Sequence, residues 1–170
     1  MNAASSIDAV LAEAKRFAGV TEQPAGSNRG VEVDYFVREA GLDPKNGYPW
    51  CACFVGQIGR QALGVAWPCP RSASVAALAA WAKTNAAAGV LVDQPARGDL
   101  FLLWFQSLNR FAHVGFVTAV TAGGFTTLEG NAAPPNAASS REGFGVFQRT
   151  RNVGPGTRFI RWVKAMREDG

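Results

Sequence analysis

The spacing of apolar residues changes at Gly89, and this change limits the possible folds more than any other feature. Before Gly89, apolar side chains recur every three or four residues, for example across residues 6–17, and this is the helical period. After Gly89, short segments rich in β-branched and aromatic residues are bounded by Gly, Pro or Asn, which is typical of strands. Helices followed by closely spaced strands predict an α+β fold, with N-terminal helices packed on a C-terminal antiparallel sheet.

The individual elements follow from the same patterns. In the third helix, apolar residues at positions 51, 54, 55, 58 and 62 form one stripe, and Gly64 follows as a stop signal. A chain of 170 residues without a repeat or linker predicts a single domain over residues 1–170. We predict helices over residues 6–17, 31–40, 51–63 and 73–88, and strands over 90–92, 99–105, 111–121, 125–129, 145–150 and 159–163.

Composition excludes several classes of protein. Hydrophobic residues make up 48% and charged residues 18% of the chain, as in ordinary globular proteins. The apolar stretches are shorter than the roughly 20 residues of a transmembrane helix, so we expect no transmembrane segment. The net charge of +4 favours weak attraction to anionic surfaces. The chain has no dense Lys/Arg run interleaved with aromatics, so we expect no nucleic-acid partner. We expect a monomer.

Residues 48–55 (YPWCACFV) carry the strongest chemical signal. A loop with a proline and an aromatic residue leads into an apolar helix, and Cys51 stands at the joint. The first turn of a helix has unpaired backbone NH groups and the positive end of the helix dipole, and both stabilise a thiolate. The same NH groups can receive the oxyanion that forms when sulfur attacks a carbonyl. Cys51 is therefore the predicted nucleophile.

His113 is the predicted base, because it is the only histidine in the chain. It begins an alternating strand on which His113, Gly115 and Val117 share a face. The small Gly115 lets a helix end or a substrate approach the imidazole closely. A neutral imidazole that takes the proton of Cys51 gives the thiolate–imidazolium pair of nucleophilic cysteine catalysis.

The imidazole needs an acceptor on its second nitrogen to fix its tautomer. The next predicted strand ends with Glu129, Gly130 and Asn131. Glu129 and Asn131 are two residues apart, so they point the same way if the strand continues. Either side chain can supply the oxygen, and the pattern alone does not choose between them.

Four motifs in this order resemble those of the CHAP domains, the cysteine, histidine-dependent amidohydrolases/peptidases of the papain-like NlpC superfamily. They are residues 50–55 (WCACFV), 98–101 (GDLF), 113–117 (HVGFV) and 129–131 (EGN). The resemblance extends over residues 19–163. It implies a papain-like fold, cleavage of amide bonds in bacterial peptidoglycan, and no metal or other cofactor.

The resemblance also implies roles for single residues. Cys51 corresponds to the nucleophile, His113 to the base, Glu129 to the group that orients the imidazole, and Asn131 to a further polar member of the site. Cys53 departs from the family pattern, where a small or apolar residue is expected. Cys51 is the better nucleophile, since Cys53 lies roughly 200° around the helix from it.

Other residues are predicted to form the substrate groove. Tyr48 and Trp50 flank the nucleophile and are predicted to form the walls of the groove, although the pattern also allows either to be a core residue. Glu22 and Asn28, in the loop of residues 21–30, can line the same groove. The three cysteines, Cys51, Cys53 and Cys69, are an odd number, so at least one thiol is free in a monomer.

Three alternatives remain open. Cys51, Cys53, Cys69 and His113 could form a thiolate metal site, although the usual C-x-x-C pairs are absent. The protein could bind the cell wall without cutting it. It could also be a cysteine transferase or deamidase that acts on a protein side chain, because a catalytic triad does not define the acceptor.

The N-terminal residues bear on localisation. Residues 1–20 lack the basic start and the uninterrupted apolar run of an export signal. We expect the protein to be made in the cytoplasm and to act in the periplasm or cell wall after delivery. It could be a phage endolysin released through a membrane pore, or a toxin that a secretion machine such as the type VI system injects into a rival. An injected toxin needs an immunity protein as partner.

Overall fold

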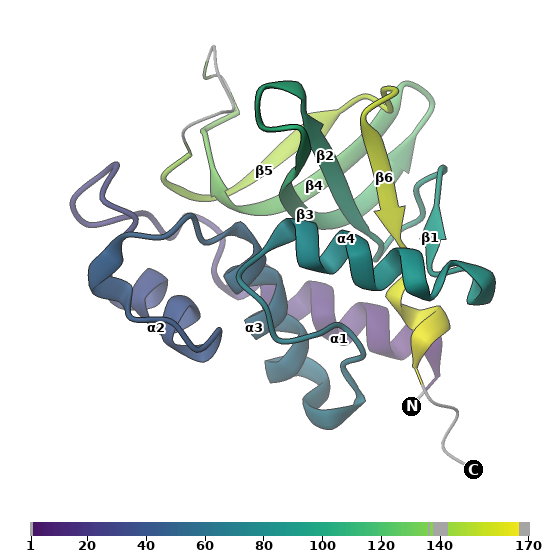
Figure 1. The fold of residues 1–170 in the computed structure, drawn as a ribbon, viewed down its shortest axis with the longest axis horizontal. Helices are drawn as coiled ribbons and strands as arrows, with labels where there is room; N and C mark the ends of the chain where they lie inside the picture. Colours follow the sequence, from purple (N-terminus) through teal and green to yellow (C-terminus); the bar gives the residue numbers. More distant parts are fainter. Residues whose placement is uncertain (1, 136, 138–142, 167–170) are drawn as a thin grey trace.

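The protein consists of a layer of helices beneath a strongly twisted antiparallel sheet (Figure 1). The computed structural model describes residues 2–135, 137 and 143–166. The helices are α1 (Ala3–Arg16), α2 (Val31–Glu39), α3 (Cys51–Leu63) and α4 (Val75–Thr84). The strands are β1 (Leu91–Val92), β2 (Leu100–Phe105), β3 (Arg110–Thr121), β4 (Gly124–Ala132), β5 (Gly145–Arg151) and β6 (Thr157–Ile160). The expected α+β architecture is confirmed.

The helix boundaries differ from the predicted ones mainly at the N-terminus of α1 and at both ends of α4, which ends at Thr84 and is followed by a separate 3-10 helix, Ala86–Ala88. Helix α1 begins at Ala3, because Asn2 caps it by accepting a hydrogen bond from the backbone NH of Ser5 at 2.9 Å. Helix α4 begins at Val75, where Ser74 accepts from the NH of Ala77. Along the part of the chain that the structure describes, no helix combines the length and apolarity needed to cross a membrane.

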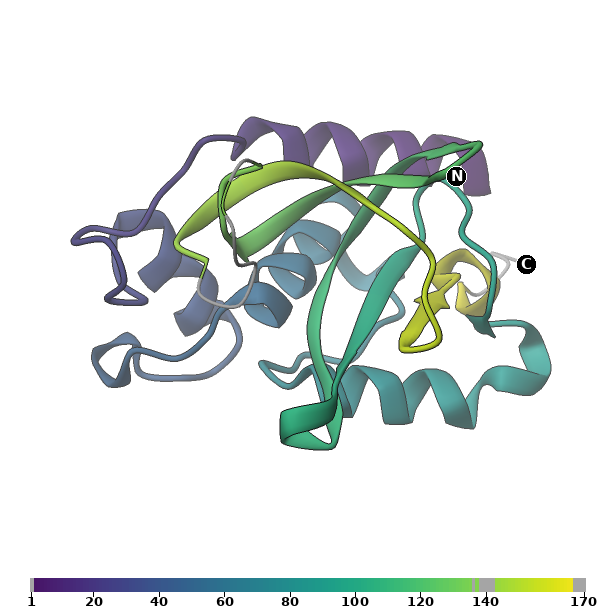
Figure 2. The same ribbon diagram turned by 90° about the horizontal axis from the view of Figure 1, so that it is seen from above.

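Helix α3 is the centre of the fold. It lies between α1 and α4 when the molecule is seen from above (Figure 2) and contacts α1, α2, β3 and β4. The prediction of a single buried stripe is wrong, because all residues from Cys51 to Gly59 are buried. Its first nine residues are small or apolar on every side except at Gln57, so neighbours can pack around the whole circumference.

The strand order in the sheet is β1-β6-β2-β3-β4-β5, and all neighbouring pairs are antiparallel. Alternate residues face opposite sides of the sheet. One side packs on the helices and belongs to the main core, with Leu100, Leu102, Val114, Phe116 and Leu128. The other side carries a second, smaller cluster of Phe101, Val117, Phe125 and Phe159.

The segment before α2 is attached to the free edge of β5. Thr21 forms a bridge with Gly145, and the NH of Glu22 donates to the carbonyl of Phe144 at 2.7 Å. The NH of Val146 donates to the carbonyl of Val20 at 2.8 Å. These hydrogen bonds hold the early loop beside the end of β4.

Two glycines of α3 give a test of how tightly this helix is packed. A Cβ at Gly59 would lie 2.2 Å from the ring of Trp67, whereas a Cβ at Gly56 would first meet the mobile end of Arg60 at 3.2 Å. Although alanine favours a helix over glycine, we expect Gly59→Ala to lower the free energy of unfolding by about 1–3 kcal/mol through overpacking. Gly56→Ala should cost clearly less. Urea unfolding of both variants measures the difference, and equal stability would contradict the packing at Gly59.

Candidate active site

Cys51 is the first residue of α3, and its surroundings hold the start of the helix in place. The NH of Phe54 donates to the carbonyl of Trp50 at 2.9 Å, which closes the first helical turn. The indole of Trp50 is stacked on Phe36 with ring centroids 5.9 Å apart. Its Nε1 donates to Glu22 Oε1 at 2.9 Å. The nucleophile position is thus fixed from the core side.

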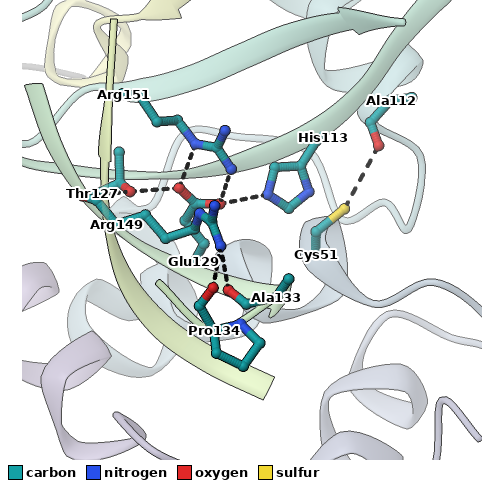
Figure 3. A network of polar contacts seen from close by, with 9 residues as sticks. All are labelled: Cys51, Ala112, His113, Thr127, Glu129, Ala133, Pro134, Arg149 and Arg151. Carbon is teal, nitrogen blue, oxygen red and sulfur yellow. Dashed lines mark hydrogen bonds and ion pairs between the residues drawn. The ribbon is translucent and has the colours of Figure 1, made fainter. Parts of the chain in front are cut away.

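A β-bulge brings His113 to this helix end. In the pairing of β2 with β3, Leu103 is opposite His113 and Trp104 is opposite Phe111, so Ala112 is an extra residue. Bulges re-aim neighbouring side chains. Here the carbonyl of Ala112 lies 4.0 Å from Cys51 Sγ, and the thiol and the imidazole lie side by side (Figure 3). Both side chains are nearly buried, with 4% of Cys51 and 6% of His113 exposed.

Glu129 orients the imidazole from the opposite side. Its Oε2 lies 2.7 Å from His113 Nε2, which leaves Nδ1 for the thiol. Burial alone would lower the pKa of His113, but hydrogen bonds and charge interactions with Cys51 and Glu129 outweigh it and raise this pKa to about 9. At neutral pH the ring is therefore an imidazolium held between two acidic groups.

The carboxylate of Glu129 has two further partners. The hydroxyl of Thr127 donates a hydrogen bond to Oε1. Arg151 donates two more, from Nε to Oε1 and from Nη2 to Oε2, and both of these are 2.6 Å long. Burial acts to raise the pKa of Glu129, but hydrogen bonds and charges of Arg151 and His113 lower it to about 2. A Cβ at Gly115 would lie 2.9 Å from Glu129 Cγ, so glycine at this position makes room for the carboxylate chain.

The thiol and the imidazole open into a groove of about 720 Å³. The lining comes from the loops before α2 and α3, the start of α4, the β2–β3 hairpin, the end of β4 and the residues just before β5. The walls combine apolar and polar side chains. Those outside the predicted set include Ser74, Val75, Phe105, Leu108, Arg110, Phe111 and Phe144.

The predicted groove residues divide into two groups. Tyr48, Asn28 and Glu22 line the groove. Glu22 is almost fully buried, and its second oxygen accepts from the NH of Asn28 at 2.9 Å, so it also braces the loop. The placement of Trp50 in the groove wall was wrong, because its indole is fully buried and packs in the core on Phe36.

Asn131 lies in the groove wall but does not contact His113 Nε2, which Glu129 occupies. In the pairing of β4 with β5, Glu129 is opposite Phe147 and Ala132 is opposite Gly145, so β4 bulges between them. Asn131 takes a left-handed conformation there, with φ of 53°. The strand therefore does not continue regularly at Asn131, so the condition for the expected shared direction of the two side chains is not met. The catalytic role of Asn131 stays a prediction.

The other two cysteines are buried and unreactive in character. Burial, together with the nearby Cys51, raises the pKa of Cys53 to about 12, and burial raises that of Cys69. All three cysteines are free thiols. Within the described residues, no three His, Cys, Asp or Glu side chains cluster as a metal site requires, so the thiolate metal site has no ligand set there.

Sequence reasoning missed Thr127 and Arg151. Thr127 could have been found, because it lies two residues before Glu129 and alternation places both on one side of the strand. Arg151 could not, since its place beside Glu129 depends on the pairing of β4 with β5 and on the curvature of the sheet.

The geometry agrees with one comparison to known proteins. The family model of the CHAP domain matches residues 43–131, which include Cys51, His113, Glu129 and Asn131. No curated protein and no solved structure matches the chain. The match spans more than half of the chain and confirms the resemblance seen in the four motifs. The chain belongs to the CHAP domain family, the cysteine- and histidine-dependent amidohydrolases and peptidases of the papain-like NlpC superfamily.

Proposed function

We propose that this protein is a peptidoglycan hydrolase that cuts amide bonds of the bacterial cell wall by thiol acyl transfer. The bond is either the one between sugar and L-alanine or one in the stem or crossbridge peptide. The observation that carries the proposal is the nearly buried Cys51–His113–Glu129 array at the floor of a groove. The CHAP family match supports hydrolysis of an amide.

The reaction follows from the positions of the groups. The Cys51 thiolate attacks the amide carbon, and the tetrahedral oxyanion forms beside the backbone NH groups that start α3. The imidazolium of His113 gives its proton to the leaving amine, so the C–N bond breaks and a thioester remains. The neutral imidazole then takes a proton from water, whose oxygen attacks the thioester. The C–S bond breaks and releases the carboxylic acid, and the Cys51 thiolate and the His113 imidazolium are restored. Glu129 holds the ring in place throughout.

The charges of the groove favour a substrate that carries a carboxylate. Arg110 lines the groove, is exposed, and forms no ion pair with any residue that the structure describes. The carboxylate of Glu22 is engaged by Trp50 and Asn28. Stem peptides of peptidoglycan carry free or amidated carboxyl groups, and the guanidinium of Arg110 can pair with the free form.

Delivery and partners are part of the proposal. The enzyme acts on the wall from the periplasmic side, either as a released endolysin or as an injected toxin. The toxin route requires an immunity protein that covers the groove. Expression directed to the periplasm, with and without the neighbouring genes of the producer, distinguishes the routes: rescue of growth by one neighbour supports the toxin.

The nucleophile assignment predicts opposite outcomes for two cysteines. Cys51→Ala should reduce release of fragments from purified sacculi on the order of 10⁶-fold, the loss seen when the nucleophile of a catalytic triad is removed. Cys53→Ala, two residues along the same buried helix, should retain most activity. Mass spectrometry of the fragments also identifies the bond that is cut. Intact sacculi with the wild-type protein would instead support a wall-binding module, and undiminished lysis by Cys51→Ala would refute the mechanism.

The raised pKa of His113 predicts an alkaline limit for activity. The imidazolium must protonate the leaving amine, so the rate should fall as the pH rises through about 9. Glu129→Gln removes a negative charge that raises the pKa of His113. The alkaline limb of the pH–rate profile of this variant should therefore lie at lower pH than that of the wild type. The ion pair between His113 and Glu129 should also stabilise the folded state fully between about pH 4.5 and 6.5, and this contribution should be lost as the pH rises through about 9. Lysis rates and melting temperatures between pH 5 and 10 test both statements.

The charge of Arg110 predicts a preference between substrates. Arg110→Glu should raise KM for stem peptides with a free carboxylate by about 10-fold or more, equivalent to the loss of one charge-assisted hydrogen bond. Peptides with amidated carboxyls should be affected less, and kcat should change little. An equal increase in KM for both kinds of peptide would show that Arg110 does not bind the carboxylate.

A further inference from the structure

Among the residues that the structure describes, Glu129 is the least exposed acidic residue, and one of its partners has no role in the scheme above. Its side chain is 0% exposed. Two cations contact it: His113 on one side and Arg151, from the far end of β5, on the other. Arg151 lies outside the residues 43–131 that match the CHAP model. Figure 3 shows the guanidinium and the imidazole on the same carboxylate.

The contact between Arg151 and Glu129 is bidentate. Nε and Nη2 each donate to a different carboxylate oxygen at 2.6 Å, so the plane of the carboxylate is fixed by two nearly parallel hydrogen bonds. The side chain of Arg151 is only 12% exposed. Its guanidinium lies 5.2 Å from the ring centre of Phe101, and this ring also packs against His113 at 5.8 Å.

Charge balance gives this contact a chemical meaning. In the reactive state the site holds two anions, the Cys51 thiolate and the Glu129 carboxylate, and one cation, the His113 imidazolium. A net negative charge in a nearly buried site is unfavourable. Arg151 supplies the second cation, which makes the four groups neutral together.

We infer that Arg151 is a positioning residue of the active site, which fixes the Glu129 carboxylate in plane and balances its charge so that the thiolate–imidazolium pair can form. This inference depends on the Cys51–His113–Glu129 site of the proposed function, but not on which substrate is cut. It predicts two separable effects, one of charge and one of geometry.

Arg149 provides a matched control on the same strand. It is also partly buried, lies two residues before Arg151, and donates Nη1 to the carbonyls of Ala133 at 2.5 Å and Pro134 at 2.7 Å. It therefore anchors backbone carbonyls, and the described contacts include no hydrogen bond or ion pair from Arg149 to Glu129. Loss of either arginine removes a partly buried cation from β5, but only the loss of Arg151 should change the position and charge environment of the His113 imidazole.

The test measures the alkylation rate of Cys51 by iodoacetamide against pH, with Cys51→Ala as the blank. In Arg151→Met, the acid limb of this profile should move to higher pH by about 1 unit or more, because the two anions lose a neighbouring cation. Arg151→Lys keeps the positive charge but cannot form the bidentate contact. The acid limb of its alkylation profile should therefore stay near that of the wild type, while its kcat for lysis of sacculi should fall. Arg149→Met should leave the limb in place.

Several outcomes would overturn the inference. An unmoved acid limb in Arg151→Met would do so, and so would an equal shift in Arg149→Met, which would mean a general loss of structure. If Arg151→Met does not fold, Arg151→Lys decides, since unchanged lytic kcat would exclude a role for the bidentate contact. Sacculi that stay intact with the wild-type protein, together with the expected alkylation shifts, would refute the proposed substrate and leave the role of Arg151 standing.

Discussion

The fully buried carboxylate of Glu129 is the constraint on which the site depends. A buried charge is costly unless hydrogen bonds and opposite charges replace its water. Here the replacement comes from β3 through His113, from β4 through Thr127 and from β5 through Arg151. The three strands must therefore be in register before the carboxylate is satisfied, so the same contacts that orient the imidazole also require correct assembly of the sheet.

The nucleophile obtains its rigidity in a different way. Helix α3 is surrounded by packed neighbours over its first nine residues, and Gly130 lets the backbone of β4 approach it, since a Cβ there would lie 2.7 Å from Phe54. The first turn cannot shift without disturbing the main core. The thiol nevertheless reaches the groove, because Cys51 is the first residue of the helix and lines the groove together with Tyr48 and Pro49. Reactivity and burial are compatible because only the end of the helix is open.

Local patterns were sufficient to predict the elements and to single out Cys51 and His113, but they did not choose between Glu129 and Asn131. Helical spacing located α3, and strand alternation placed His113 and Gly115 on one face. Features that depend on pairing between strands were not accessible, because sequence alone does not show register. The extra residue Ala112, the left-handed Asn131 and the contact of Arg151 with Glu129 all belong to this class. The burial of Trp50 was missed because an aromatic residue beside a nucleophile fits either a groove or a core.

Strand β5 connects the supports of the two reacting groups. At its beginning, Gly145 bridges Thr21, and this pairing holds Glu22 where it accepts the indole NH of Trp50, next to Cys51. At its end, Arg151 holds Glu129, which orients His113. The nucleophile and the base are thus positioned through residues near both ends of the chain, outside the span that carries the chemistry. Because both supports share one strand, a displacement of β5 would change the distance between sulfur and imidazole even though β5 contributes no reacting atom.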